Sequence, residues 1–228
     1  MEVTLPPELA RHLPDSALEA ILTHVRRAEE EFAATVRGST SRGTPYTFGG
    51  IKRQVAEGLF ALVREVRPRR AVETGVCNGA STAVLLTALE RNGEGQLDSL
   101  DFPEYTDTPY APGTFWEGKL GAAVPRGKAP GWLVPTPLRR RWRLHLGRSQ
   151  ELLSGLLEQL GEIDFFLHDS EHSYECQSFE YRLAWQHLRP GGVLASDDIS
   201  WSPAFAEFAA VVRRTPVHLH RKVAYLVK

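Results

Sequence analysis

The stretch Ala71–Thr82 constrains the fold most, because it reads as a buried strand, a tight loop and the start of a helix. Apolar residues lead to Glu73, where we expect the strand to end, and Gly75 and Gly79 bracket the loop. From Ala80 the apolar residues recur at helical spacing. A strand that feeds a helix through glycines presents free N–H groups and the positive end of a helix dipole. The sequence therefore predicts an α/β unit with a ligand site at this loop.

The rest of the chain alternates between short apolar runs and helical patterns. This order predicts an α/β, doubly wound, Rossmann-like fold with a mostly parallel, seven-stranded sheet. The last two strands are close in sequence, so we expect an antiparallel strand at the C-terminal end. The expected strands cover residues 71–73, 96–101, 142–146, 163–168, 193–196, 217–220 and 223–227. Helices are expected over residues 51–66, 173–188 and 203–213, and over two further stretches, one beginning at Ala80 and one capped by Ser149.

Residues 1–49 are expected to form an N-terminal helical extension and loop, ahead of a domain over residues 50–228. An amphipathic helix from Asp15 to about Val36 either packs on the domain by one face or serves as a lid or dimer element. The glycine- and threonine-rich loop 38–50 is either a linker or a lid that closes over a bound cofactor. A homodimer is therefore one expectation.

Composition excludes several classes of protein. The chain has 228 residues, is 42% hydrophobic and 24% charged, and carries a net charge of −1. This charge provides no basic field for nucleic acid, and no apolar run approaches the ~20 residues that a membrane span needs. The N-terminus lacks a signal-peptide pattern, and Cys77 and Cys176 fit neither a disulfide framework nor a zinc site. We expect a cytoplasmic protein that binds neither nucleic acid nor membranes.

Residues 102–138 form a proline- and aromatic-rich insertion that is long for a connection within a compact domain. The prolines restrict its backbone. Its aromatic residues either wall a substrate pocket or make a dimer contact. They include Tyr105, Tyr110, Trp116 and Trp132.

Four of the expected strands end in acidic residues, namely Glu73, Asp101, Asp169 and the pair Asp197–Asp198. Ligands bind at the carboxyl ends of parallel strands, where these acids should converge. Unpaired carboxylates ~4 Å apart repel by ~4 kcal/mol at an effective dielectric of ~20. The later three acids therefore need a cation or shared protons, unless one of the adjacent pair only caps the next loop. Oxygen ligands suit Mg²⁺, Mn²⁺ or Ca²⁺.

Four stretches carry a resemblance to a known family: residues 72–81, 146–150, 167–174 and 196–199. In this order they resemble the divalent-metal-dependent O-methyltransferases, which are class I S-adenosylmethionine (SAM) enzymes. The likeness is distant for the catechol type and closer for the macrocin type, which methylates sugars and antibiotics. It covers residues 50–228.

The resemblance implies a role for individual residues. At SAM it places Glu73, Gly75, Asn78, Gly79, Ser81, Asp101, Arg148, Ser149, Gln150 and Asp169. Among these, Glu73 would hold the methionine ammonium group and Asp101 the ribose hydroxyls, although a strand-end acid can also be merely exposed. The metal ligands would be Asp169, Asp197 and Asp198, and the catalytic base would be His172 or Glu171.

Two positions depart from the family pattern. Arg148 stands where many relatives have an acid or a small residue, and Asp198 stands where the catechol type has Asn. The second departure adds negative charge and favours a tightly held dication.

The function that these features predict is transfer of a methyl group from SAM to a hydroxyl of a small molecule, with a divalent metal activating that hydroxyl. The acceptor would be a sugar, polyol or natural product, in a pocket walled by residues 38–50 and 102–138. Two alternatives stay open. One is a metal-independent SAM methyltransferase in which His172 works alone, and the other is a methyltransferase-like domain that binds without catalysis.

Overall fold

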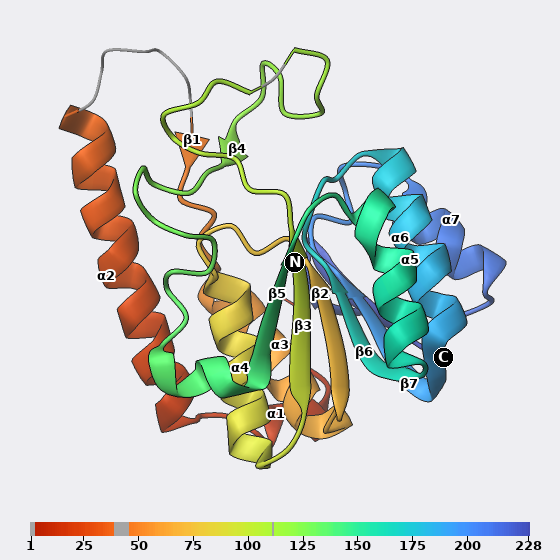
Figure 1. Ribbon diagram of the computed structural model, residues 1–228. Coiled ribbons are helices and arrows are strands. Elements are labelled where there is room, and N and C mark those ends of the chain that lie inside the picture. Colours follow the sequence, from red (N-terminus) through yellow and green to blue (C-terminus); the bar gives the residue numbers. More distant parts are fainter. Residues whose placement is uncertain (1–2, 39–45, 111) are drawn as a thin grey trace.

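The computed structural model describes residues 3–38, 46–110 and 112–228. Within them a seven-stranded sheet has the strand order β5-β3-β2-β6-β7-β9-β8 (Figure 1). Parallel pairs join β5 through β7, and β9 runs antiparallel to both β7 and β8. The strands are β2 (Arg70–Thr74), β3 (Gln96–Asp101), β5 (Trp142–Leu146), β6 (Ile163–His168), β7 (Leu188–Ser196), β8 (Val217–His220) and β9 (Val223–Val227). The predicted doubly wound, mostly parallel sheet is confirmed.

Helices cover both faces of the sheet (Figure 1). One face carries α1 (Pro7–Ala10), α2 (Ser16–Gly38), α3 (Arg53–Val66) and α4 (Ala80–Asn92). The other carries α5 (Ser149–Leu160), α6 (Tyr174–His187) and α7 (Ala204–Val211). Each layer has its own apolar core, because side chains alternate across the strands. In β6, for example, Phe165 and Leu167 join the first core while Phe166 joins the second.

The order of the strands reverses at β2, and this reversal positions the site. From β2 the chain moves outward through β3 to β5, then crosses to β6 on the other side of β2. Connections on opposite sides leave a crevice at the carboxyl ends of the two central strands. Glu73 pairs with Ser99 on one side and Leu167 on the other, so the strand ends are level.

Helix α2 packs by its apolar face on its own chain. Leu18, Val25 and Phe32 are buried in the first core, and α2 contacts α3 and α4. At its start the Asp15 carboxylate accepts hydrogen bonds from the backbone N–H groups of Ala17 and Leu18. These contacts favour the packed interpretation of the helix.

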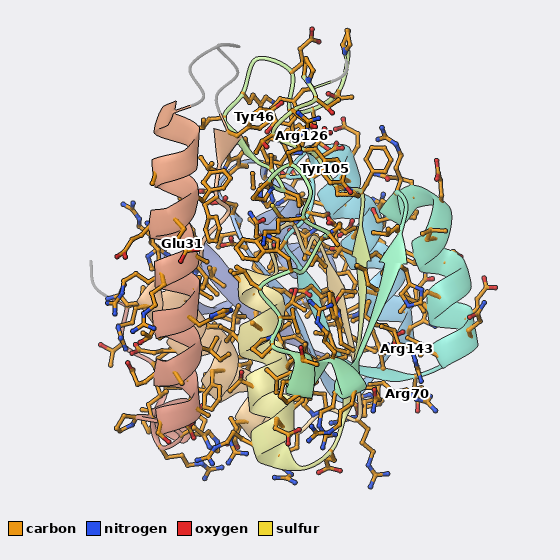
Figure 2. All side chains as sticks on the ribbon, turned by 60° about the vertical axis from the view of Figure 1, so that its left-hand side comes forward. Glu31, Tyr46, Arg70, Tyr105, Arg126 and Arg143 are labelled. Atoms are coloured by element: carbon orange, nitrogen blue, oxygen red, sulfur yellow. The ribbon has the colours of Figure 1, made fainter. Side chains whose placement is uncertain are left out.

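Two distant segments pair above the carboxyl ends of the strands. β1 (Tyr46–Thr47), after α2, runs parallel to β4 (Gly121–Ala122), within the insertion. The insertion ends in a 3₁₀ helix, η2 (Thr136–Arg141). Figure 2 shows Tyr46, Tyr105 and Arg126 at this end of the molecule, and Arg70 and Arg143 at the other. Residues 39–45 of the predicted lid lie outside the described residues.

Several boundaries differ by one or two residues from those predicted, and two differences concern a turn and a helix cap. β7 begins at Leu188, where residues 189–192 were expected to turn, because Leu188 pairs with Ile163 through an irregular register. Helix α5 has Arg148 at its N-cap, without a side-chain hydrogen bond, so the prediction that Ser149 caps it is wrong. Across the described ranges, no helix has both the length and the apolar character that a membrane crossing requires.

Candidate active site

A cavity of about 390 Å³ opens at the carboxyl ends of the central strands, a size typical of small-molecule sites. The insertion and the segment after α2 contribute to its walls. The predicted site residues that line it are Gly75, Ser81, Asp101, Arg148, Ser149, Gln150, Asp169, Glu171, His172, Asp197 and Asp198. Glu73, Asn78 and Gly79 do not line it.

Gly75 is required where the glycine loop crosses the end of β6. Its φ is +86°, and a Cβ added there would lie 2.0 Å from the carbonyl oxygen of Asp169. Gly79 has a φ of +93° and is the N-cap of α4. Only glycine adopts these angles at low cost. The loop can therefore pass tightly between two strand ends and expose its backbone to the cavity.

Glu73 belongs to a buried hydrogen-bond network. Its carboxylate accepts hydrogen bonds of 2.8 Å from the hydroxyls of Ser81, Thr82 and Ser99. Burial raises the pKa of Glu73 to about 7, despite these hydroxyl donors. Since the side chain is fully buried and absent from the cavity wall, the arrangement favours a structural role for Glu73 over a direct contact with the cofactor.

We expect Glu73→Gln to remove a pH dependence of stability. The pKa of Glu73 is about 7 in the folded protein and about 4.5 without the fold, so the folded state binds the proton more tightly. The resulting stabilisation is complete below about pH 4.5 and is lost as the pH rises through about 7, by at most ~3 kcal/mol. Unfolding free energies of both proteins from pH 5 to 8 would test this. If the unfolding free energies of the two proteins changed in parallel with pH, the result would contradict this expectation.

Asn78 joins the glycine loop to the structures above it. Its buried amide donates to the carbonyls of Phe48 and Ala123, at 2.6 and 3.2 Å, and accepts from the indole N–H of Trp132 at 2.6 Å. The side chain is thus fully engaged away from the cavity. This geometry favours a structural role for Asn78 over the cofactor contact that the resemblance implied.

We expect Asn78→Ala to lower the free energy of unfolding by about 2–4 kcal/mol, because it leaves two carbonyls and one indole N–H buried without partners. Denaturant unfolding would measure the loss. Thr87→Ala is a matched control, since it removes a hydrogen bond of a buried hydroxyl within α4 only. A loss in Asn78→Ala no larger than in this control would contradict the structural role.

Asp101 faces the cavity at the end of β3. Its two oxygens accept from the backbone N–H groups of Val76 and Cys77, at 3.3 and 3.2 Å. Burial raises the pKa of Asp101 to about 6. These long hydrogen bonds leave lone pairs for a ligand's hydroxyl groups. Nearby, the Arg148 guanidinium lies 4.3 Å from the centroid of the Phe102 ring, which forms a flat wall beside Asp101.

Asp169 and Asp197 lie side by side, because they follow the adjacent parallel strands β6 and β7. The backbone N–H of Asp169 donates a hydrogen bond to the backbone carbonyl of Thr74, and the N–H of Asp197 donates one to the carbonyl of His168. Burial and then the charge of Asp197 raise the pKa of Asp169 well above its usual value, whereas burial and then the charge of Asp198 raise that of Asp197. A hydrogen bond joins the two. Such a pair of carboxylates can share a proton or accept a cation.

Asp198 is arranged differently from its neighbour. It has a φ of +47°, and Lys222 Nζ donates to its Oδ1 at 2.7 Å. Its Oδ2 lies 3.6 Å from His172 Nε2. Among the described residues, no three His, Cys, Asp or Glu side chains are arranged to hold one metal ion. Asp169 and Asp197 fit as carboxylate ligands of a dication, whereas the carboxylate of Asp198 is already paired with an ammonium group.

Both candidate bases reach the cavity. His172 is almost fully buried, and this burial lowers its pKa to about 3. Glu171 accepts a hydrogen bond of 2.6 Å from the hydroxyl of Ser173. The imidazole of His172 therefore holds a neutral nitrogen near the acids, while the Glu171 carboxylate is engaged by the helix cap.

Aromatic rings close the cavity over His172. The centroids of Trp116 and Trp201 lie 6.0 and 5.6 Å from the imidazole, and Phe115 packs on both tryptophans. The position of Trp116 agrees with the pocket-wall alternative, whereas Trp132 lies away from the cavity. Sequence reasoning missed Trp201 and Lys222. No local pattern marks Lys222, because only the pairing of β9 with β7 brings it to the acids.

A mostly parallel sheet in this strand order, with a glycine loop and acids at its carboxyl edge, defines a methyltransferase fold. The profile of a methyltransferase domain matches residues 72–199, which is more than half of the chain. The chain therefore belongs to the methyltransferase domain family. None of the curated proteins matches its sequence.

Solved structures share this fold at low identity. The O-methyltransferase TomG from Streptomyces achromogenes, in complex with SAM, is 16% identical, with a TM-score of 0.59 over 96% of this chain and 92% of TomG. The Podospora anserina methyltransferase PaMTH1, bound to S-adenosylhomocysteine (SAH), is 12% identical, with a TM-score of 0.56 over 99% of this chain and 98% of PaMTH1. The cmcI-D160 structure with Mg and SAM is 19% identical, with a TM-score of 0.51 over 78% of this chain and 72% of cmcI-D160.

Proposed function

We propose that the chain transfers a methyl group from SAM to a hydroxyl of a small molecule, with a divalent cation at Asp169 and Asp197. The observation that carries the proposal is the convergence of Asp101, the carboxylate pair and His172 on one cavity. The SAM in TomG and the Mg and SAM in cmcI-D160 support the same ligands for this fold.

The cofactor would lie along the carboxyl ends of β2 and β3. Asp101 would accept hydrogen bonds from the ribose hydroxyls of SAM, and the backbone of the Gly75 loop would lie against the methionine end of SAM. The face formed by Phe102 and Arg148 takes the adenine ring by stacking. These positions bring the methyl group toward the acids and His172.

His172 would act as the base. A hydroxyl oxygen of the acceptor attacks the methyl carbon, so that an O–C bond forms as the S–C bond breaks and SAH leaves. The hydroxyl proton goes to His172 Nε2. A dication bound beside the acceptor would lower the pKa of the reacting hydroxyl and hold it in position. We choose His172 over Glu171 because its ring lies under the aromatic wall, beside Asp198.

The aromatic wall favours an acceptor with a flat ring or an apolar sugar face. Phe115, Trp116 and Trp201 offer ring faces and edges above the base. Aromatic stacking is worth about 0.5–1.5 kcal/mol per ring pair beyond the area that it buries. Hydroxylated aromatic rings and sugars are therefore the acceptors to screen first.

Metal-independent transfer is the second candidate, and the ion pair between Lys222 and Asp198 favours it. This ammonium group already neutralises one of the three carboxylates. In this case the base and the alignment of the hydroxyl would suffice, and exhaustive EDTA treatment would leave turnover unchanged.

Calorimetric titration of SAM and SAH, with Mg²⁺ and after EDTA, tests the proposal first. We expect micromolar binding in both conditions, followed by methyl transfer from labelled SAM to at least one acceptor. The loss of transfer after EDTA would favour the metal mechanism. Absence of cofactor binding in every condition would overturn the proposal.

A further inference from the structure

A buried polar pair lies behind the active site and outside its wall. His168 and Glu180 are fully buried, and His168 Nδ1 lies 2.7 Å from Glu180 Oε2. The same carboxylate accepts from the hydroxyls of Thr74 and Ser170, at 2.5 and 2.9 Å. Buried polar groups are costly unless they are paired, so this arrangement calls for a reason beyond packing.

The contacts of Glu180 define the tautomer of His168. Burial opposes ionisation of Glu180, but its hydrogen bonds, including the one with His168, keep the pKa of this carboxyl below its usual value. An ionised carboxylate only accepts hydrogen bonds. His168 must therefore carry a proton on Nδ1, and in its neutral form Nε2 bears the lone pair.

The lone pair of His168 then defines the tautomer of His172. His168 Nε2 lies 3.4 Å from His172 Nδ1, so His172 donates inward from Nδ1. The opposite nitrogen, Nε2, is left without a proton. It lies 3.6 Å from Asp198 Oδ2, which is longer than a hydrogen bond and agrees with two facing acceptors.

We propose that Glu180 and His168 are positioning residues that hold His172 with the lone pair of Nε2 toward the cavity. This inference rests on the proposed function for the role of His172 as a base. The proton from the acceptor hydroxyl arrives at Nε2 as the O–C bond forms and the S–C bond breaks. The imidazolium so formed faces Asp198 on one side and, through His168, the buried carboxylate on the other.

Long-range ¹H–¹⁵N NMR of the full chain, at a pH where the histidines are neutral, reads the tautomers directly. The spectrum of His172→Gln assigns the signals of that ring. We expect a protonated Nδ1 and an unprotonated Nε2 for His172. A spectrum with the proton of His172 on Nε2 would overturn the proposal without any activity measurement.

The double variant His168→Phe/Glu180→Gln removes the pair and leaves no unpaired buried charge. Without an inward acceptor, we expect His172 to move its proton to Nε2 and donate to Asp198. We expect kcat to fall by about 10²-fold or more, with the Kd of SAM and the KM of the acceptor unchanged. An unchanged tautomer with unchanged kcat would overturn the proposal, and so would a fall in kcat without a change of tautomer.

Tyr181→Phe is the matched control. The Tyr181 hydroxyl bonds Ser196 in the same buried region, and its ring lies 5.4 Å from that of His168. We expect a lower Tm with the tautomer and kcat unchanged; a reversed tautomer here would show that any disturbance of this core has the same effect. If the native chain methylates no acceptor, the proposed function fails, while the spectra still decide the positioning.

Discussion

Asp169→Asn is expected to lower kcat for methyl transfer by about 10³-fold, while the Kd of SAM changes by less than about threefold. Asp169 follows β6 and pairs with Asp197. Its carboxylate is the part of the site best suited to hold a dication against the reacting hydroxyl, and such a cation contributes several kcal/mol. An amide is a poorer ligand for it. The fold should tolerate the change, since asparagine keeps a hydrogen bond to Asp197 and removes the repulsion between two buried acids.

The measurement compares initial rates and calorimetric Kd values for the native and variant chains. Glu175→Gln is a matched control, because it makes the same chemical change on the exposed first turn of α6. We expect the control to keep its kcat. An Asp169→Asn chain that is equally active would refute the metal mechanism, and it would turn attention to the Lys222 ion pair.

Asp101→Ala is expected to raise the Kd of SAM and SAH by about 10- to 100-fold. The variant loses the charged acceptor that would hold the ribose, and hydrogen bonds to charged groups contribute about 1.5–3 kcal/mol each. It also frees the N–H groups of Val76 and Cys77, which Asp101 now holds. Asp101→Asn separates the two effects, because an amide oxygen can still accept from the loop.

Titration calorimetry measures both ligands with each variant. Asp98→Asn is the control, since Asp98 lies on the same strand and bonds His145 away from the cavity. Native affinity in Asp101→Ala would exclude the ribose role. Equal losses in Asp101→Asn and Asp98→Asn would point to a general disturbance of β3.

Local sequence patterns predicted the sheet and its active edge with few errors. The predicted strands at 96–101, 142–146, 163–168, 217–220 and 223–227 coincide with those of the structure. In these strands apolar residues alternate with polar ones or form short runs, and turn residues lie near their ends, so local patterns located them. The acids were predicted to converge because each one ends an expected strand or directly follows it.

The roles of the side chains within that edge were harder to predict. Glu73 and Asn78 sit in the glycine motif, yet the structure engages both in buried hydrogen bonds. A motif fixes where a residue lies along the chain, but not which way its side chain faces. That direction depends on partners such as Ser99 and Trp132, which come from other elements.

The sequence by itself determined the α/β fold, the glycine loop and the set of acids, because these depend on neighbours along the chain. Only the tertiary structure decided which groups the acids and His172 meet. Lys222 reaches Asp198 through the pairing of β9 with β7. Glu180 meets His168 because α6 packs on β6. Such contacts join residues that are brought together only when helices and strands pack, so their electrostatic environment is a property of the folded chain.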